Sequence, residues 1–179
     1  MTVPLSVRPA TAADVDALHA LVNSAYRGDS SKAGWTSEAD LLDGQRTDPE
    51  GLRETIAPPG SVILVHEEAG DLIACVNLER TDDASGTACY LGMLTVKPTR
   101  QASGLGRQLL AASEAFARDE WKARLVHMTV IVQRAELIAW YERRGYTRTG
   151  LLERFPYGDA RFGLPRRDDL QFEVLEKVL

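Results

Sequence analysis

The sequence has few cysteines and no long apolar segment. Its 179 residues include only Cys75 and Cys89, which lie in apolar stretches without CxxC spacing. We therefore expect neither a disulfide framework nor a zinc site, and reduced thiols indicate a cytoplasmic protein. No run approaches the roughly 18 apolar residues of a membrane-spanning helix, so no membrane association is expected. The first residues lack a charged start followed by an apolar stretch, and no secretory signal is expected.

A large excess of positive charge is also absent. Lysine and arginine number 21 against 26 aspartates and glutamates, for a formal net charge of −5. This balance argues against nucleic acid as the partner. The 44% hydrophobic and 26% charged composition is typical of globular proteins. A chain of this length suits one domain with a full core, and we predict a single domain over residues 1–179.

Hydrophobic periodicity predicts a mixed α/β (α+β) domain whose central sheet is mostly antiparallel and flanked by helices. Strands are predicted at 6–9, 62–66, 72–79, 89–96, 124–132, 146–152 and 171–178. A helix is predicted to follow a capping box formed by Thr11 and Asp14. Further helices are predicted from Gly104 onward and at 136–144, with short helical pieces at 37–42 and 49–56.

One strand-to-helix connection carries the strongest functional signal. Residues 96–106 read VKPTRQASGLG, between a predicted strand and a predicted helix. Small residues allow consecutive backbone N–H groups to point outward at the positive end of a helix dipole, where an anion binds. Gly104 and Gly106 permit a close approach by a diphosphate. The segment has neither the Gly-Lys-Ser/Thr of a Walker loop nor the GxGxxG pattern of a dinucleotide-binding fold. Its spacing alone therefore leaves two interpretations: a site for an unspecified anion, or a turn that only packs a helix against a sheet.

The same segment resembles a family signature. Gln101-x-x-Gly104-x-Gly106, preceded by Val96-x-Pro98, is similar to the acetyl-CoA signature of the GCN5-related N-acetyltransferase (GNAT) superfamily. A later run, YERRGY at 141–146, resembles the second hallmark of that family. The order of predicted elements is similar over 6–178. The resemblance implies a GNAT-like fold in which two central strands splay apart and the pantetheine arm of acetyl-CoA fills the gap.

The resemblance also implies which residues bind acetyl-CoA. Main-chain groups of Leu94, Thr95 and Val96 would bind the arm and the thioester carbonyl, and one backbone N–H would stabilise the developing oxyanion. Family members often have an asparagine that contacts the other side of the arm. This chain has Arg134 at that position, so any contact there would be made by an arginine. The pyrophosphate would lie on the turn and the start of the helix, at Arg100, Gln101, Ala102, Ser103, Gly104, Leu105, Gly106 and Arg107.

Transfer of an acetyl group to an amine requires proton transfer in two places. An alkylammonium has a pKa near roughly 10.4 and must lose a proton before it attacks. Many family members have an acid near the position of Tyr90, and the strand at 89–96 has none. Glu79 is the first candidate base and His127 the second, although a solvated strand-end charge and a satisfied core histidine are the commoner explanations of such residues. The resemblance implies Tyr141 as the acid that protonates the leaving thiolate.

The acceptor is predicted to be an amine of a small molecule, a peptide or a protein. Trp35 and Glu38, in the long polar connection at 27–60, and Tyr157, in the loop at 155–169, lie in regions that flank the acceptor pocket of the family. Aromatic and acidic groups there could hold a cation. No metal is expected, and a homodimer is possible because dimers are common in the family.

Two other functions are compatible with the sequence. The chain could bind acetyl-CoA as a non-catalytic sensor domain of the same fold, since its base is not obvious. It could also bind a different anion, such as a nucleotide, on the same turn. Thiol release from acetyl-CoA in the presence of an amine panel would separate an enzyme from a sensor.

Overall fold

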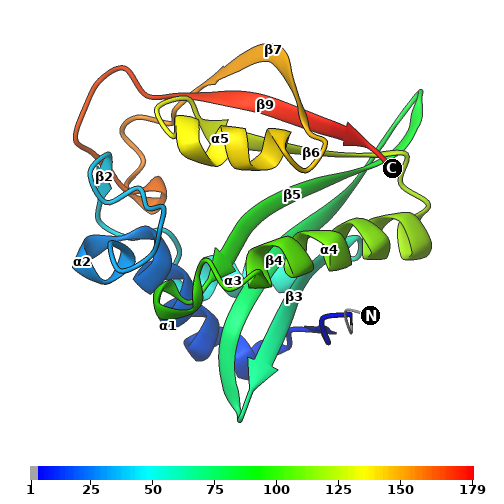
Figure 1. Ribbon diagram of the computed structural model, residues 1–179, viewed down its shortest axis with the longest axis horizontal. Helices are drawn as coiled ribbons and strands as arrows, with labels where there is room; N and C mark the ends of the chain where they lie inside the picture. Colours follow the sequence, from blue (N-terminus) through cyan, green and yellow to red (C-terminus); the bar gives the residue numbers. More distant parts are fainter. Residues whose placement is uncertain (1–3) are drawn as a thin grey trace.

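The computed structural model describes residues 4–179, and its main feature is a seven-stranded sheet in the order β1-β3-β4-β5-β6-β9-β7 (Figure 1). The β5–β6 pair is parallel and the other neighbouring pairs are antiparallel. The predicted mixed, mostly antiparallel sheet is therefore confirmed. Its strands are β1 (Arg8–Pro9), β3 (Ser61–Glu68), β4 (Asp71–Asp83), β5 (Gly86–Val96), β6 (Leu125–Ile131), β7 (Thr147–Arg154) and β9 (Gln171–Val178).

Helices cover both faces of this sheet. The five α-helices of the described residues are α1 (Val15–Tyr26), α2 (Gly28–Ser31), α3 (Pro49–Ile56), α4 (Leu105–Trp121) and α5 (Ala135–Glu142). One core packs α4 and α5 against the sheet through residues such as Leu78, Leu91, Leu109 and Ile138. A second core packs α1 and α3 against the opposite face through Leu18, Leu52, Val65 and Cys75. Within residues 4–179 no helix is long and apolar enough to cross a membrane.

Local sequence signals explain several element boundaries. The Thr11 side chain accepts from the backbone N–H of Ala13, and the capping box with Asp14 is present, as predicted. The turn between β3 and β4 has positive φ angles at Ala69 and Gly70, 51° and 86°. Two consecutive left-handed residues form the turn that matches the twist of a two-residue hairpin.

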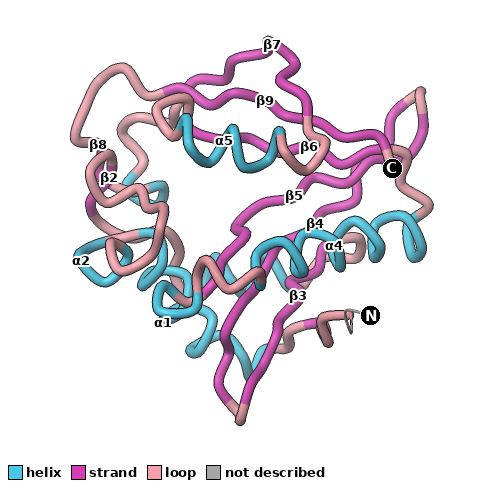
Figure 2. Tube along the Cα trace, in the orientation of Figure 1, coloured by secondary structure: helices cyan, strands magenta, loops and turns pink. Residues whose placement is uncertain are grey.

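The predicted helix at 37–42 is wrong. Residues 38–41 form a turn, and Leu42 starts the short strand β2 (Leu42–Asp43), which pairs with β8 (Leu164–Pro165). The Glu38 side chain is turned inward to two arginines, a long-range contact that overrides local helix preference. Figure 2 shows the resulting arrangement, in which the loops around β2 and β8 lie together beside the end of the sheet.

The two central strands separate partway along their length. Pairing between β5 and β6 is recorded only from Ala88 with Leu125 to Tyr90 with His127. Beyond this point β5 diverges from β6, as Figure 1 shows on the left of the view. The register between β4 and β5 shifts just there, and Met93 has a left-handed φ of 55°. An irregularity of this kind bends a strand and redirects it.

Candidate active site

The divergence of β5 from β6 leaves a free strand edge. Thr95 pairs with Cys75 of β4, and the Lys97 N–H donates to the Ile73 carbonyl, so both residues point their main-chain groups toward β4. Because main-chain groups alternate in direction along a strand, those of Leu94 and Val96 point to the open edge.

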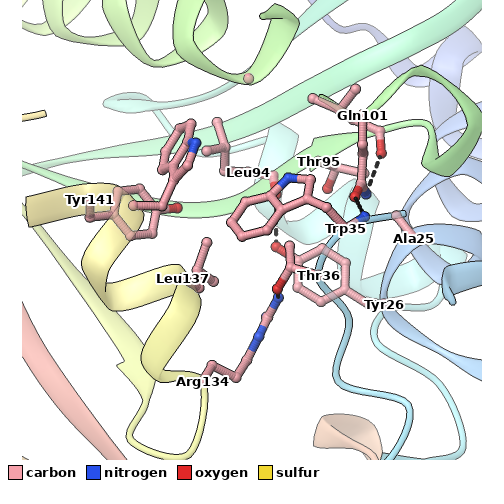
Figure 3. A pocket seen from close by; sticks show the side chains of 13 residues that line it. Ala25, Tyr26, Trp35, Thr36, Leu94, Thr95, Gln101, Arg134, Leu137 and Tyr141 are labelled. Atoms are coloured by element: carbon pink, nitrogen blue, oxygen red, sulfur yellow. Dashed lines mark hydrogen bonds between the residues drawn. The ribbon is translucent and has the colours of Figure 1, made fainter. Parts of the chain in front are cut away.

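Two side chains already use the carbonyl groups of this edge. The Tyr26 hydroxyl donates to the Leu94 carbonyl over 2.9 Å, and Gln101 Nε2 donates to the Val96 carbonyl over 3.2 Å (Figure 3). The N–H groups of Leu94 and Val96 remain directed into the opening. Of the three main-chain sites predicted for the cofactor arm, the geometry favours Leu94 and Val96 over Thr95.

The turn between β5 and α4 forms a cradle of backbone N–H groups. Gly104 has a φ of 87° and precedes α4, whose first N–H groups have no partner within the helix. The N–H groups of Ala102, Ser103 and Gly104 have no backbone acceptor among residues 4–179. Gly106 packs under the Trp140 ring, where a Cβ would lie 3.6 Å from the ring, an ordinary contact distance. The arrangement suits a diphosphate.

Positive charge surrounds the same cradle. Arg107 and Arg144 line a cavity with Trp140, Gln101 and the turn. The Arg144 guanidinium lies over the Trp140 ring, 3.7 Å from its centroid, and donates to the Trp140 carbonyl. Burial, together with the nearby charges of Arg143 and Arg107, lowers the pKa of Arg144. The positive charges of these arginines repel one another, and a bound anion would reduce that repulsion.

Arg100 differs from the other predicted phosphate contacts. Its guanidinium makes two hydrogen bonds to the Glu68 carboxylate, of 2.5 and 3.0 Å. This pair draws the side chain to the end of β3. Arg107 is therefore better placed than Arg100 for the phosphate contact that the sequence predicts.

Trp35 lies on the cofactor side of the opening. Its backbone N–H donates to Gln101 Oε1 over 3.1 Å, and a Cβ at the preceding Gly34 would lie only 2.1 Å from that oxygen. The indole lies between Gln101 and Tyr141 in Figure 3, and its ring centroid is 6.4 Å from that of Trp140. The ring lines the cavity that also contains Val96 and Gly106, on the cofactor side. The contact of Trp35 with the acceptor therefore stays a prediction.

Tyr141 stands where two cavities meet. It is 5% exposed and packs edge-on against Trp140 and Tyr146. Its hydroxyl points into the opening in Figure 3 and has no hydrogen-bond partner among the described side chains. Burial raises the pKa of Tyr141, so the hydroxyl is protonated at neutral pH. A neutral phenol at this place can donate a proton.

The second cavity lies on the other side of Tyr141 and has a volume of about 350 Å³. It shares Tyr26, Leu94, Arg134 and Leu137 with the first cavity, as well as Tyr141. The two cavities thus adjoin each other at Leu94 and Tyr141, in the opening between β5 and β6.

A buried ion triad closes the far side of this opening. Glu38 accepts from Arg27 over 2.6 Å and from Arg134 over 3.0 Å, and all three side chains are at most 8% exposed. Arg134 also donates to the Thr36 hydroxyl over 2.9 Å. Arg27 follows α1 and Arg134 precedes α5, so the triad connects the two halves of the sheet. Glu38, predicted to bind a cation, is fully occupied by arginines.

The two candidate bases lie on one face of the sheet. Glu79 pairs with Tyr90 in the β4–β5 ladder and accepts from Asn77 over 2.9 Å, and like His127 it does not itself line the larger cavity. His127 packs on the Tyr90 ring at a centroid distance of 5.5 Å, and that ring does line the cavity. Burial lowers the pKa of His127, against smaller opposing effects of Glu153 and Glu176.

Tyr157 lies outside both cavities. Its hydroxyl donates to the Arg167 carbonyl over 2.9 Å and accepts from the Leu170 N–H over 2.8 Å. These bonds hold the loop before β9 in place. The predicted acceptor contact of Tyr157 stays untested, and the geometry gives this residue a structural task.

Sequence reasoning missed five residues of the site. Tyr26 lies on the apolar face of its helix, and Arg27, Arg46 and Glu153 of the larger cavity carry no local sequence signal. Arg144 belongs to the YERRGY run at 141–146. It lies four residues after Trp140 near the end of the predicted helix, and this spacing was the one sequence signal for its contact with that ring. Within the described residues no group of three or more His, Cys, Asp or Glu side chains could hold a metal.

A comparison with family models matches residues 17–146 to the acetyltransferase (GNAT) family. The chain belongs to this family. It is therefore an acetyltransferase, and the splayed strands and the turn at 96–106 are the GNAT features of this chain. A search of curated proteins found no match.

Solved GNAT structures share the fold at low identity. The ribosomal-protein-alanine N-acetyltransferase from Brucella melitensis is 23% identical, with a TM-score of 0.70 over 98% of this chain and 100% of that chain. A mutant of the spermidine N-acetyltransferase SpeG from Vibrio cholerae is 16% identical, with a TM-score of 0.67 over 97% and 95%. A putative phosphinothricin N-acetyltransferase is 15% identical, with a TM-score of 0.68 over 97% and 98%.

Replacing Glu38 by glutamine would leave two buried arginine charges without a counter-ion. We predict that Glu38→Gln lowers the free energy of unfolding by about 3–5 kcal/mol, because removing one partner of a buried ion pair strands the other. Urea denaturation of the purified protein measures the change.

Asp40→Asn is the matched control, because the Asp40 side chain is 85% exposed and its pair with Lys32 lies at the surface. Exposed pairs contribute at most about 1 kcal/mol. Equal stability of the Glu38→Gln and Asp40→Asn variants would contradict the structural role of the triad.

Proposed function

We propose that this chain moves an acetyl group from acetyl-CoA directly to the amine of an acceptor. The observation that carries the proposal is the pair of cavities that meet at Leu94 and Tyr141. The first cavity leads to the N–H cradle, and the larger cavity extends along β6 and β7. A cofactor and an acceptor can therefore reach the same point from different cavities.

The residues present fit acetyl-CoA, which would supply the acetyl group as a thioester. The cradle at 102–106, with Arg107 and Arg144 beside it, would hold the pyrophosphate. The open edge of β5 would pair with the amides of the pantetheine arm. The Leu94 N–H would then face the thioester carbonyl and stabilise negative charge on its oxygen during attack.

Tyr141 would protonate the sulfur of the leaving thiolate. Its hydroxyl is neutral, has no other partner among the described side chains and faces the opening. The role does not require Tyr141 to ionise before the reaction. The surrounding Trp140 and Tyr146 rings exclude water and fix the direction of the hydroxyl.

Direct attack is favoured over an acetyl-cysteine route. Cys75 and Cys89 are both fully buried, and burial raises the pKa of each thiol to about 12. Because the thiolate is the nucleophilic form, neither side chain reacts readily near neutral pH. The amine itself is thus the nucleophile in this proposal.

Proton removal from the amine would pass through water to His127. The half-buried imidazole touches Tyr90 at the wall of the acceptor cavity, and its lowered pKa keeps it neutral at pH 7. Neutral imidazole is the form that accepts a proton. Glu79, the other candidate, also neighbours Tyr90, but its carboxylate is hydrogen bonded to Asn77.

Loss of the Tyr141 hydroxyl should slow the chemical step. We predict that Tyr141→Phe lowers kcat about 10²- to 10⁴-fold, the range typical of a lost general acid, while the Kd for acetyl-CoA stays unchanged. Thiol release measures turnover, and calorimetric titration measures cofactor binding.

Tyr157→Phe is the control, since the hydrogen bonds of that hydroxyl within residues 4–179 both go to its own loop. Wild-type turnover by Tyr141→Phe would rule out the assigned role. Tight binding of acetyl-CoA by the unmodified protein, with no thiol release for any amine, would instead favour a sensor domain.

The role of His127 predicts a pH dependence. Because burial lowers the pKa of His127 from its usual 6.5, the neutral form persists at and above pH 6.5. We expect kcat/KM to fall only as the pH drops through a value below 6.5, and His127→Gln to remove that inflection. Steady-state profiles for the two proteins and for His19→Gln test this, and an identical acid limb in all three would contradict it.

A further inference from the structure

The larger cavity carries an excess of positive charge. Its charged lining consists of four arginines and two glutamates: Arg27, Arg46, Arg134, Arg154, Glu38 and Glu153. The lining therefore has a formal charge of +2, although the chain as a whole has −5. A cavity lined mainly by one sign of charge concentrates ligands of the opposite sign.

The buried triad contributes part of this excess. Arg27 and Arg134 share the single carboxylate of Glu38, so the triad retains one positive charge. The Nε atoms of both arginines are buried and have no hydrogen-bond partner among residues 4–179. Because the three side chains are screened from water, their net charge acts on the cavity at low dielectric.

Arg46 supplies the accessible cation. Its guanidinium makes no ion pair or hydrogen bond with the described residues, and its Cζ lies 5.2 Å from the centroid of the Tyr26 ring. Its backbone N–H donates to Asn23 Oδ1 over 2.7 Å, which anchors the segment to α1. The Tyr26 hydroxyl in turn touches the Leu94 carbonyl. One tyrosine thus sets the place of the free guanidinium relative to the reacting centre.

A neighbouring cavity does not cancel this charge. It also contains Arg46, and its other charged residues are Asp48, Glu54, Glu79, Arg80 and Arg161. Apart from the shared Arg46, three acids face two arginines there, so the two cavities together still carry a formal charge of +1. Arg154, at the rim of the larger cavity, likewise makes no ion pair with the described residues.

The remaining lining is largely apolar. It includes Leu42, Leu91, Met128, Ile131, Phe155 and Phe172. A cavity of about 350 Å³ with such walls fits a small molecule with an apolar body. Glu153 also lines the cavity and makes no ion pair with the residues that the structure describes, so its carboxylate provides a partner for the ammonium of an incoming amine.

Building on the proposed acetyl transfer, we infer that the acceptor is a small amine with an apolar body and a carboxylate, the chemistry of an apolar amino acid, and that Arg46 binds the carboxylate. A guanidinium presents two parallel N–H donors that match the two oxygens of a carboxylate. The inference replaces the cation-holding pocket expected from sequence, because its acid, Glu38, is consumed by the triad.

Matched acceptors test the inference. The set is leucine, leucinamide and 3-methylbutylamine, with phenylalanine, phenylalaninamide and 2-phenylethylamine as a second series, each assayed for acetyl-CoA-dependent thiol release. We expect kcat/KM for the carboxylated member to exceed those of its two analogues at least about tenfold, the effect of one charged hydrogen-bonded contact.

Arg46→Gln should reduce this ratio to near one, and the change should appear in KM for the amino acid rather than in kcat. Arg161→Gln is the control and should retain the ratio, because Arg161 pairs with Asp159 and lies outside the larger cavity. A ratio that survives Arg46→Gln would overturn the assignment of Arg46.

The proposed function and this inference fail in different ways. Equal turnover of the three members of a series, or turnover of the decarboxylated amines alone, would overturn the inference and leave acetyl transfer intact. Binding of acetyl-CoA without turnover of either amino acid would also overturn it. Absence of both acetyl-CoA binding and thiol release would contradict the proposed function itself.

Discussion

The site depends on the separation of β5 from β6. Backbone N–H and C=O groups that are removed from water must find partners, and a strand that leaves its neighbour exposes a row of them. Here the Tyr26 hydroxyl and the Gln101 amide satisfy two carbonyls of the exposed edge, at Leu94 and Val96. The N–H groups that remain unsatisfied define where an extended ligand would pair.

A second interaction lies beside this opening. The Glu38 carboxylate draws Arg27, beside α1, and Arg134, before α5, into one buried cluster that connects the two halves of the sheet. The same cluster places a net positive charge at the wall of the larger cavity. One structural device thereby supports the opening and sets the electrostatic character of the space beside it, which is opposite in sign to that of the whole chain.

The sequence predicted the parts of this structure that have local signals. Periodicity and turn residues indicated α3 and β9 with their observed bounds, and the signature at 96–106 located the N–H cradle. Contacts between distant residues left no such signal: Tyr26 meets Leu94 across 68 positions, and Glu38 meets Arg134 across 96. A tyrosine on an apolar helix face is a usual core residue, and a glutamate in a polar loop is a usual surface residue. Neither position indicates a role in the site, so both roles became visible only in the three-dimensional structure.

Residue-resolved amide hydrogen exchange, with and without coenzyme A, tests the central claim most directly. If the open edge of β5 pairs with the cofactor arm, coenzyme A should slow exchange at Leu94, Val96 and the cradle at 102–106. Thr95, which faces β4, should change little. Unchanged exchange at Leu94 and Val96 in the presence of saturating coenzyme A would contradict the account.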